Sequence, residues 1–264
     1  MALPGHFPGW DRPRAFVQLG AGFEVDGFFD AEPACAPMST AGLASPLPSV
    51  AGCPLRLVLG QVGRTQILVG HGHRYCYEGC GVREAVLPVV AAAQAGITDI
   101  VLVEPGFALR EDFACGTWLA VTDYINAMGV RPAEGFLDLI REPFLDMTDA
   151  LSQSLNAEII NAAARVGFSL RLGVYQATGG PQFDTPAEAE AARRSGADVL
   201  GNAIVPEIIV GALLGCRVSA LILVAETAAS YGGRRLRRTS MLDATNFCSQ
   251  ALGRILHGLY AETD

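Results

Sequence analysis

The densest group of side chains that could take part in chemistry lies at residues 70–81, which read GHGHRYCYEGCG. Histidines, an arginine, tyrosines and a glutamate stand there between glycines, and they could bind a metal ion, bind an anion, or form a crowded turn. A zinc site usually takes His and Cys ligands at regular intervals, with a second cluster elsewhere in the chain. Because the other histidines are His6 and His257 alone, we expect neither a metal nor a cofactor.

A second candidate is the glycine turn at residues 20–27, GAGFEVDG, which follows an apolar segment. Backbone N–H groups in such a turn can hold an anion. The spacing is not that of the dinucleotide pattern GxGxxG, because Asp26 stands between Val25 and Gly27 and the last glycine comes one residue late. A plain turn is therefore at least as good an interpretation.

Two carboxylates follow apolar segments. In GGPQFDT, residues 179–185, Phe183 and Asp184 come after a glycine loop at the end of an expected strand, where α/β folds bind their ligands. Asp184 could instead cap a helix that begins at Pro186. Glu226 stands at the end of the apolar run LILVAET, where burial without a partner would be costly.

The elements that must position these groups alternate along the chain. We expect strands at 15–20, 55–60, 65–70, 98–106, 118–126 and 216–227, another strand that begins at 171, and a short strand after 197. We expect helices at 82–96, 147–167 with Thr148 as N-cap, 185–196 and 240–262, and a further helix that ends before 215. Residues 31–54 are expected to form a loop. This alternation indicates an α/β layered fold with helices on both faces of a sheet. No internal repeat or linker is visible, so we predict a single domain over residues 1–264.

Composition excludes several classes of function. The formal net charge of −8 argues against a nucleic-acid partner, and the one basic run, RRLRR at 234–238, is typical of a solvated loop. All 19 basic residues are arginines, which excludes Schiff-base lysines and a P-loop lysine. The seven cysteines are odd in number and scattered, as in a protein with reduced thiols. Without a signal peptide or a membrane span, we expect a cytoplasmic protein with no membrane partner.

From about residue 16 to residue 228 the order of segments resembles the trimeric purine nucleoside phosphorylases and their methylthioadenosine phosphorylase relatives. Residues 179–215 carry the most specific match: GPxF(D/E)T, a helix, GAD and then VPE follow in the family's order and spacing. The resemblance implies a phosphorylase/hydrolase-like fold with a central mixed β-sheet flanked by helices. It also implies a nucleoside or free base as the small-molecule partner, and a homotrimer.

The resemblance implies roles for the residues that contact base and sugar. Phe183 would stack on the purine, Asp184 would bind the edge of its ring, and Tyr77 would line the sugar. Phe144 matches an aromatic side chain that a neighbouring subunit places over the ribose. Glu226 falls where guanine-selective members have asparagine and adenine-selective members have aspartate, which favours a 6-aminopurine; pairing of Glu226 with a nearby arginine is the structural alternative.

The phosphate-binding motif is altered. The family pattern G-R-x-H-x-Y-E-G aligns here so that His73 replaces the arginine, Tyr75 replaces the histidine, and Arg74 is displaced by one position. A shifted register would restore the histidine at the expense of a two-residue insertion. Neither register restores the arginine.

Two serines that would contact phosphate are also replaced. Gly20 and Ala21 stand in GAG where the family has GSG, and Ala203 replaces a serine beside Asn202, which itself replaces a methionine. Losing several charge-assisted hydrogen bonds of about 1.5–3 kcal/mol each should weaken phosphate binding strongly.

Three interpretations follow. The protein could cleave or form the N-glycosidic bond of a purine-type nucleoside with weak or no use of phosphate, His73 acting as a base toward water. It could catalyse another reaction on a nucleoside-like metabolite, with His73 or Tyr75 as acid or base. It could also be a non-catalytic ligand-binding homologue, or retain conventional phosphorolysis if an arginine reaches the site.

Overall fold

The structure is a computed structural model that describes residues 9–38, 53–134, 144–228 and 237–261, together with Leu3, Phe7, Phe136 and Leu139. Its strands are β1 (Ala15–Leu19), β2 (Ala34–Pro37), β3 (Arg56–Val62), β4 (Thr65–His71), β5 (Asp99–Ala108), β6 (Trp118–Ala127), β7 (Arg171–Thr178), β8 (Val199–Gly201) and β9 (Arg217–Thr227). Its helices are α1 (Gly81–Gln94), α2 (Gln153–Arg165), α3 (Pro186–Arg194), α4 (Val205–Leu213) and α5 (Arg238–Tyr260), with a 3-10 turn, η2 (Cys76–Glu78).

The nine strands form one mixed sheet in the order β2-β3-β4-β1-β5-β8-β7-β6-β9. Strand β9 also pairs with β5, so the second half of the sheet curls round and closes on itself. Strand β1 is parallel to both of its neighbours and lies in register with β5, Leu19 opposite Val103. The residues that follow β1 therefore lie beside the second half of β5.

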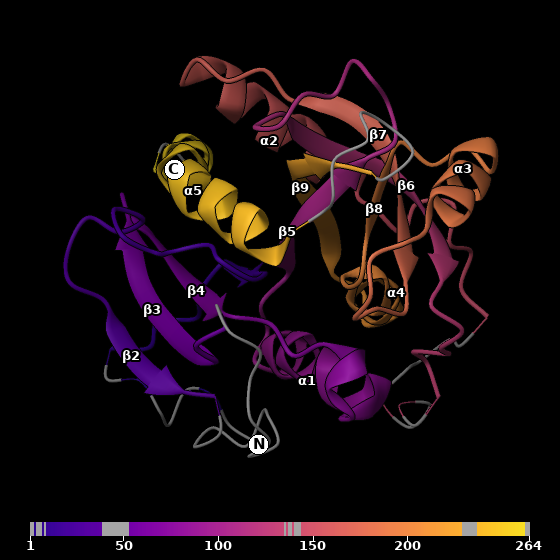
Figure 1. Cartoon of the computed structure of the whole chain (residues 1–264). Helices are drawn as coiled ribbons and strands as arrows, with labels where there is room; N and C mark the ends of the chain where they lie inside the picture. Colours follow the sequence, from indigo (N-terminus) through magenta and orange to yellow (C-terminus); the bar gives the residue numbers. More distant parts are fainter. Residues whose placement is uncertain are drawn as a thin grey trace.

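Helices cover both faces of the sheet, as the alternating pattern predicts (Figure 1). Residues of α1, α3 and α4 share one buried apolar cluster, and residues of α2 and α5 share a second. Successive side chains of β1 point to opposite faces of the sheet, so Phe16 packs in the first cluster and Val17 in the second. The α/β class with a central mixed sheet is confirmed.

Two local predictions were wrong. Helix α2 has Ser152 rather than Thr148 as its N-cap, with the Ser152 hydroxyl accepting from the Leu155 N–H at 3.3 Å. Thr148 is engaged one turn earlier, where its hydroxyl donates to Asp146 at 2.6 Å. The expected loop 31–54 contains β2, which pairs antiparallel with β3 because that edge offered unpaired backbone groups; residues 39–52 of that loop lie outside the described residues.

Other local predictions are confirmed. Strands β3 and β4 form the expected hairpin. Helix α3 begins at Pro186, and Thr185 and Glu188 form a capping box around its first turn. Among the described helices, none combines the length and the apolar character that crossing a membrane would require.

Candidate active site

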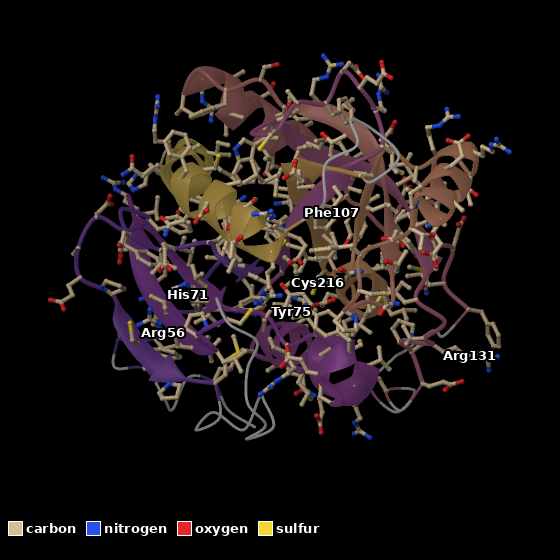
Figure 2. The ribbon with its side chains drawn as sticks, in the orientation of Figure 1. Arg56, His71, Tyr75, Phe107, Arg131 and Cys216 are labelled. Carbon is tan, nitrogen blue, oxygen red and sulfur yellow. The ribbon has the colours of Figure 1, made fainter. Side chains whose placement is uncertain are left out.

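A cavity of about 160 Å³ lies where η2, β5, the loop after β7, the turn before α4 and the start of α5 meet. It is lined by Tyr75, Tyr77, Glu104, Pro105, Phe107, Pro181, Phe183, Gly201, Asn202, Arg238 and Met241. Figure 2 labels two of them, Tyr75 near α1 and Phe107 in the closed part of the sheet. Ligand pockets usually measure roughly 300–1,000 Å³, so this cavity fits a group the size of a sugar.

Aromatic rings form the cavity walls. Tyr75 and Tyr77 stack with ring centroids 4.9 Å apart, and Phe107 meets Phe183 edge to face at 5.1 Å. Gly180 makes this arrangement possible, because its φ is +58° and a Cβ atom there would lie 2.7 Å from the Tyr77 ring. The glycine loop after β7 thus brings Phe183 toward the tyrosines, as the sequence pattern suggests.

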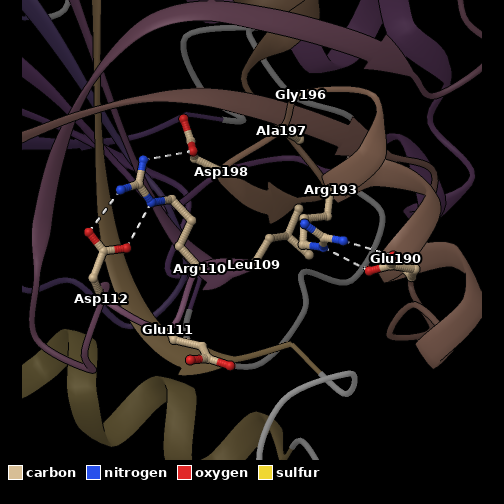
Figure 3. A pocket seen from close by; sticks show the side chains of 9 residues that line it. All are labelled: Leu109, Arg110, Glu111, Asp112, Glu190, Arg193, Gly196, Ala197 and Asp198. Atoms are coloured by element: carbon tan, nitrogen blue, oxygen red, sulfur yellow. Dashed lines mark hydrogen bonds and ion pairs between the residues drawn. The ribbon is translucent and has the colours of Figure 1, made fainter.

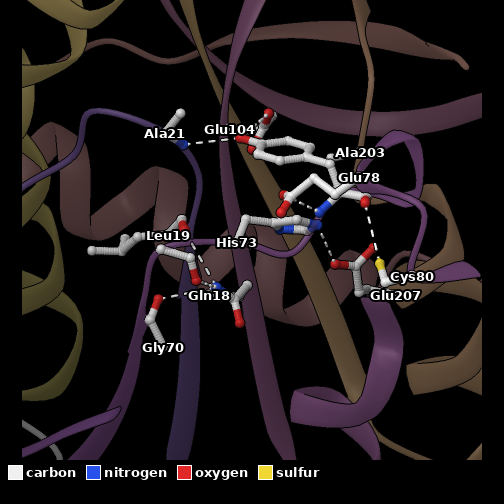
Figure 4. Close-up of polar contacts among 12 residues, drawn as sticks. Gln18, Leu19, Ala21, Gly70, His73, Glu78, Cys80, Glu104, Ala203 and Glu207 are labelled. Atoms are coloured by element: carbon white, nitrogen blue, oxygen red, sulfur yellow. Dashed lines mark hydrogen bonds and ion pairs between the residues drawn. The ribbon is translucent and has the colours of Figure 1, made fainter. Parts of the chain in front are cut away.

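The glycine turn after β1, at Gly20 and Ala21, packs against the carboxylate of Glu104. The Ala21 N–H donates to Tyr75 Oη at 3.0 Å, and Tyr75 Oη donates to Glu104 Oε1 at 3.1 Å (Figure 4). A Cβ atom on Gly20 would lie 2.0 Å from Glu104 Oε2, so a larger residue at this position would displace the carboxylate. The N–H group expected to bind an anion is engaged by a tyrosine, and a glutamate side chain lies against the turn.

Glu104 is the residue that sequence reasoning missed. It is 3% exposed, and its Oε2 has no hydrogen-bond partner among the described residues. Burial raises its pKa to about 7, although His73 and the hydrogen bond from Tyr75 oppose this change. The sequence signal was an acidic residue in the middle of the apolar strand DIVLVEPG, because burying a carboxylate without a partner is costly.

His73 lies outside the cavity lining and is paired inside the protein. Its Nε2 lies 3.0 Å from Glu207 Oε1, and both side chains are buried (Figure 4). Burial by itself would lower the pKa of His73, but Glu207, with Glu104 and Glu78 farther away, raises it to about 9. The pairing with Glu207 therefore favours a protonated His73 at neutral pH, which argues against its expected role as a base.

Arg74 also forms an ion pair inside the protein. Its Nη1 donates to Glu78 Oε2 at 2.9 Å, and both side chains are almost fully buried. The displaced arginine thus pairs with the glutamate of its own loop. Asn202, in contrast, lines the cavity and donates to Thr178 Oγ1 at 2.9 Å.

The two carboxylates expected at the base lie beside the cavity. Asp184 lines a second cavity of about 450 Å³ on the other side of the glycine loop, and it accepts from Thr178 Oγ1 at 3.4 Å. Burial, with a smaller effect from Glu188, raises the pKa of Asp184. Glu226 is half-buried on β9, in register with Phe107 on β5. Paired residues on adjacent strands project to the same face of a sheet, which places Glu226 next to the aromatic wall.

Phe144, expected to reach a neighbouring subunit, is 92% exposed. The lining of the cavity in its own chain does not include it. The structure thus brings Tyr75, Tyr77, Phe183 and Asn202 together around the cavity, and Phe144 is not among the lining residues.

A larger cleft of about 710 Å³ lies elsewhere, between the loop after β5 and α3 (Figure 3). Most of its charged side chains already pair with one another: Arg110 with Asp112 and Asp198, and Arg193 with Glu190. It offers no aromatic wall, so we place the active site in the smaller cavity. In the described parts of the chain, no three His, Cys, Asp or Glu side chains are grouped so as to hold a metal ion.

Known proteins resemble this chain in sequence and in fold. The family model described as the phosphorylase superfamily matches residues 41–260. The purine nucleoside phosphorylase of Mycobacterium leprae is 32% identical over 214 residues, covering 81% of this chain and 76% of that protein. Purine nucleoside phosphorylase 1 of Geobacillus stearothermophilus is 30% identical over 201 residues, covering 76% and 73%.

Among solved structures, a Schistosoma purine nucleoside phosphorylase in complex with hypoxanthine superimposes with a TM-score of 0.83 at 18% identity. The match covers 96% of this chain and 92% of that one. At this identity the likeness concerns the fold, and it agrees with the mixed sheet and the helical layers described above.

Proposed function

Because the chain belongs to the phosphorylase superfamily, we propose that it cleaves or forms the N-glycosidic bond of a purine-type nucleoside and uses water in place of inorganic phosphate. The observation that carries this proposal is the buried contact of Glu104 with Tyr75 at the glycine turn. A carboxylate lies where the resemblance leads us to expect an anion, while the aromatic walls for sugar and base are present.

The charges around the cavity argue against a phosphate site. An ionised Glu104 would repel a phosphate dianion, and this repulsion is strong where water is excluded. The side chains expected to bind the anion have other partners, His73 pairing with Glu207 and Arg74 with Glu78. Arg238 lines the cavity and is hydrogen-bonded to Tyr77. Among the described residues that line the cavity, few donors thus remain for a phosphate group.

Cleavage is expected to be independent of phosphate and to release free ribose. Nucleosides should be incubated with the protein with and without inorganic phosphate, and the sugar product identified by mass spectrometry. Equal rates and free ribose are the expected result, because water occupies the position of the nucleophile. Ribose 1-phosphate, formed with saturable dependence on phosphate, would contradict the proposal.

In the proposed complex, Phe183 stacks on the base and Tyr77 contacts the sugar. Asp184 and Glu226 bind the edge of the base and favour a 6-aminopurine. The raised pKa of Asp184 supports different roles for the two carboxyl groups: one donates a proton, and the other accepts a hydrogen bond. A proton given to the departing base would assist its release.

The protein is expected to be a homotrimer in which Phe144 completes the ribose site of a neighbouring subunit. The 92% exposure of this ring supports the prediction, since a large apolar side chain at the surface gains from burial in an interface. Phe144→Ala should raise the KM for nucleoside about tenfold or more, whereas Phe247→Ala, at a ring that is 88% exposed on α5, should leave the KM unchanged. A monomer by sedimentation that binds nucleoside fully would rule this assembly out.

A further inference from the structure

We infer that Glu104 is the general base that takes a proton from the attacking water molecule. This inference rests on the proposed hydrolysis and assigns its nucleophile-activating group. Glu104 projects from β5 into the wall of the cavity formed by the aromatic side chains. No other carboxylate lines that cavity among the described residues.

The two oxygens of Glu104 have different surroundings. Oε1 accepts from Tyr75 Oη at 3.1 Å, and the same tyrosine is anchored by the Ala21 N–H at 3.0 Å. Oε2 is buried, has no partner among the described residues, and packs closely against the backbone of Gly20. One oxygen is therefore held in place, while the other keeps an unused acceptor that the attacking water molecule reaches from the cavity in the proposed reaction.

In the proposed hydrolysis, water replaces the base at the anomeric carbon of the sugar. A water oxygen forms a bond to the anomeric carbon, and the bond from that carbon to the base nitrogen breaks with its electron pair moving to the base. The water proton passes to Glu104 Oε2, and the departing base takes a proton from Asp184, Glu226 or solvent. The products are ribose and free base, and Glu104 then returns its proton to solvent. An ionised Glu104 also offsets the positive charge that develops on the sugar.

The neighbouring titratable groups are less suited to this task. The charged and titratable groups that act on Glu104 include His73, Glu207 and Arg238, the tyrosines Tyr75, Tyr77 and Tyr175, and the thiol of Cys53. His73 is protonated at neutral pH, and burial holds the pKa of Tyr75 well above its usual value. Glu104, with a pKa of about 7, is the carboxylate among the described residues lining the cavity, and it can accept a proton near neutral pH.

Glu104→Gln tests the inference, because glutamine keeps the shape and still accepts from Tyr75. We expect kcat to fall by about 10²- to 10⁴-fold, with the affinity for nucleoside measured by calorimetry nearly unchanged. In the wild type, kcat should rise with pH to a plateau through about pH 7; in the variant this rise should be absent. Glu84→Gln is the matched control, since Glu84 also has a buried oxygen without a partner but lies outside the cavity lining.

Two further variants distinguish a chemical role from a structural one. Glu104→Ala should regain part of its activity when formate is added, because a free carboxylate can fill the space. Tyr75→Phe should move the rise in kcat to higher pH, because the hydrogen bond from Tyr75 lowers the pKa of Glu104. An effect on folding alone would produce neither result.

Water labelled with ¹⁸O separates failure of the inference from failure of the proposed function. Wild-type protein that places ¹⁸O in ribose, together with a Glu104→Gln variant whose kcat stays within about threefold of wild type with the same pH profile, would overturn the inference and leave hydrolysis standing. Wild-type protein that forms ribose 1-phosphate, or that cleaves no nucleoside, would remove both.

Discussion

Glu207→Gln is expected to lower the free energy of unfolding by about 3 kcal/mol at pH 6, and to have little effect at pH 10. The reason is the buried pair between His73 and Glu207, whose atoms are 3.0 Å apart. Without Glu207, burial would favour the neutral imidazole. The shift of the His73 pKa from 6.5 to about 9 corresponds to roughly this free energy.

The pH range follows from the direction of the shift. His73 has a higher pKa in the folded state than in the unfolded state, so its contribution is complete below pH 6.5 and is lost as pH rises through about 9. Urea unfolding at pH 6 and pH 10 would measure it. Glu158→Gln is the control: Glu158 pairs with Arg217 at a site 40% exposed, and such a pair contributes about 0–1 kcal/mol. An equal loss in Glu207→Gln at both pH values would show that the ion pair is not responsible.

Glu226→Asn is expected to reverse the preference between bases, from 6-aminopurines to 6-oxopurines. An ionised carboxylate only accepts hydrogen bonds, which suits the amino group of a 6-aminopurine. An asparagine amide can donate to a 6-oxo group and accept from the adjacent ring N–H. Since an unpaired polar group in a desolvated site costs about 1–3 kcal/mol, the ratio of kcat/KM for the two bases should change by roughly 10- to 100-fold.

Adenosine and inosine are suitable probes for this change, with kcat/KM measured for each. Glu226→Asp is the matched control, because it keeps an acceptor-only carboxylate and should keep the original preference. The register of Glu226 with Phe107, whose ring meets Phe183 at 5.1 Å, places it close enough to the proposed base site for such an effect. An unchanged ratio in Glu226→Asn would show that Glu226 does not contact the base.

Features that depend on nearby residues could be predicted from the sequence. The start of α3 at Pro186, the hairpin of β3 and β4, and the alternation of strands and helices depend on local propensity and on hydrophobic period. The motif around Phe183 was informative for the same reason: its glycine loop, aromatic ring and following helix are contiguous. The N-cap of α2 was misplaced because Thr148 and Ser152 both suit that role locally, and Asp146 engages the threonine.

What only the tertiary structure decided is the electrostatic character of the site. Parallel pairing of β1 with β5 brings the turn at Ala21 beside Glu104, and the loop after β4 places Tyr75 between them. His73 meets Glu207 because that loop packs against α4. These groups are far apart along the chain, and no local pattern encodes which strand ends become neighbours. The sequence by itself determined which residue types stand in the glycine turn and in the 70–81 loop, and its resemblance to the family led to the prediction of a weakened anion site. The packing of distant strands decided that a carboxylate with a pKa of about 7 lies beside that turn.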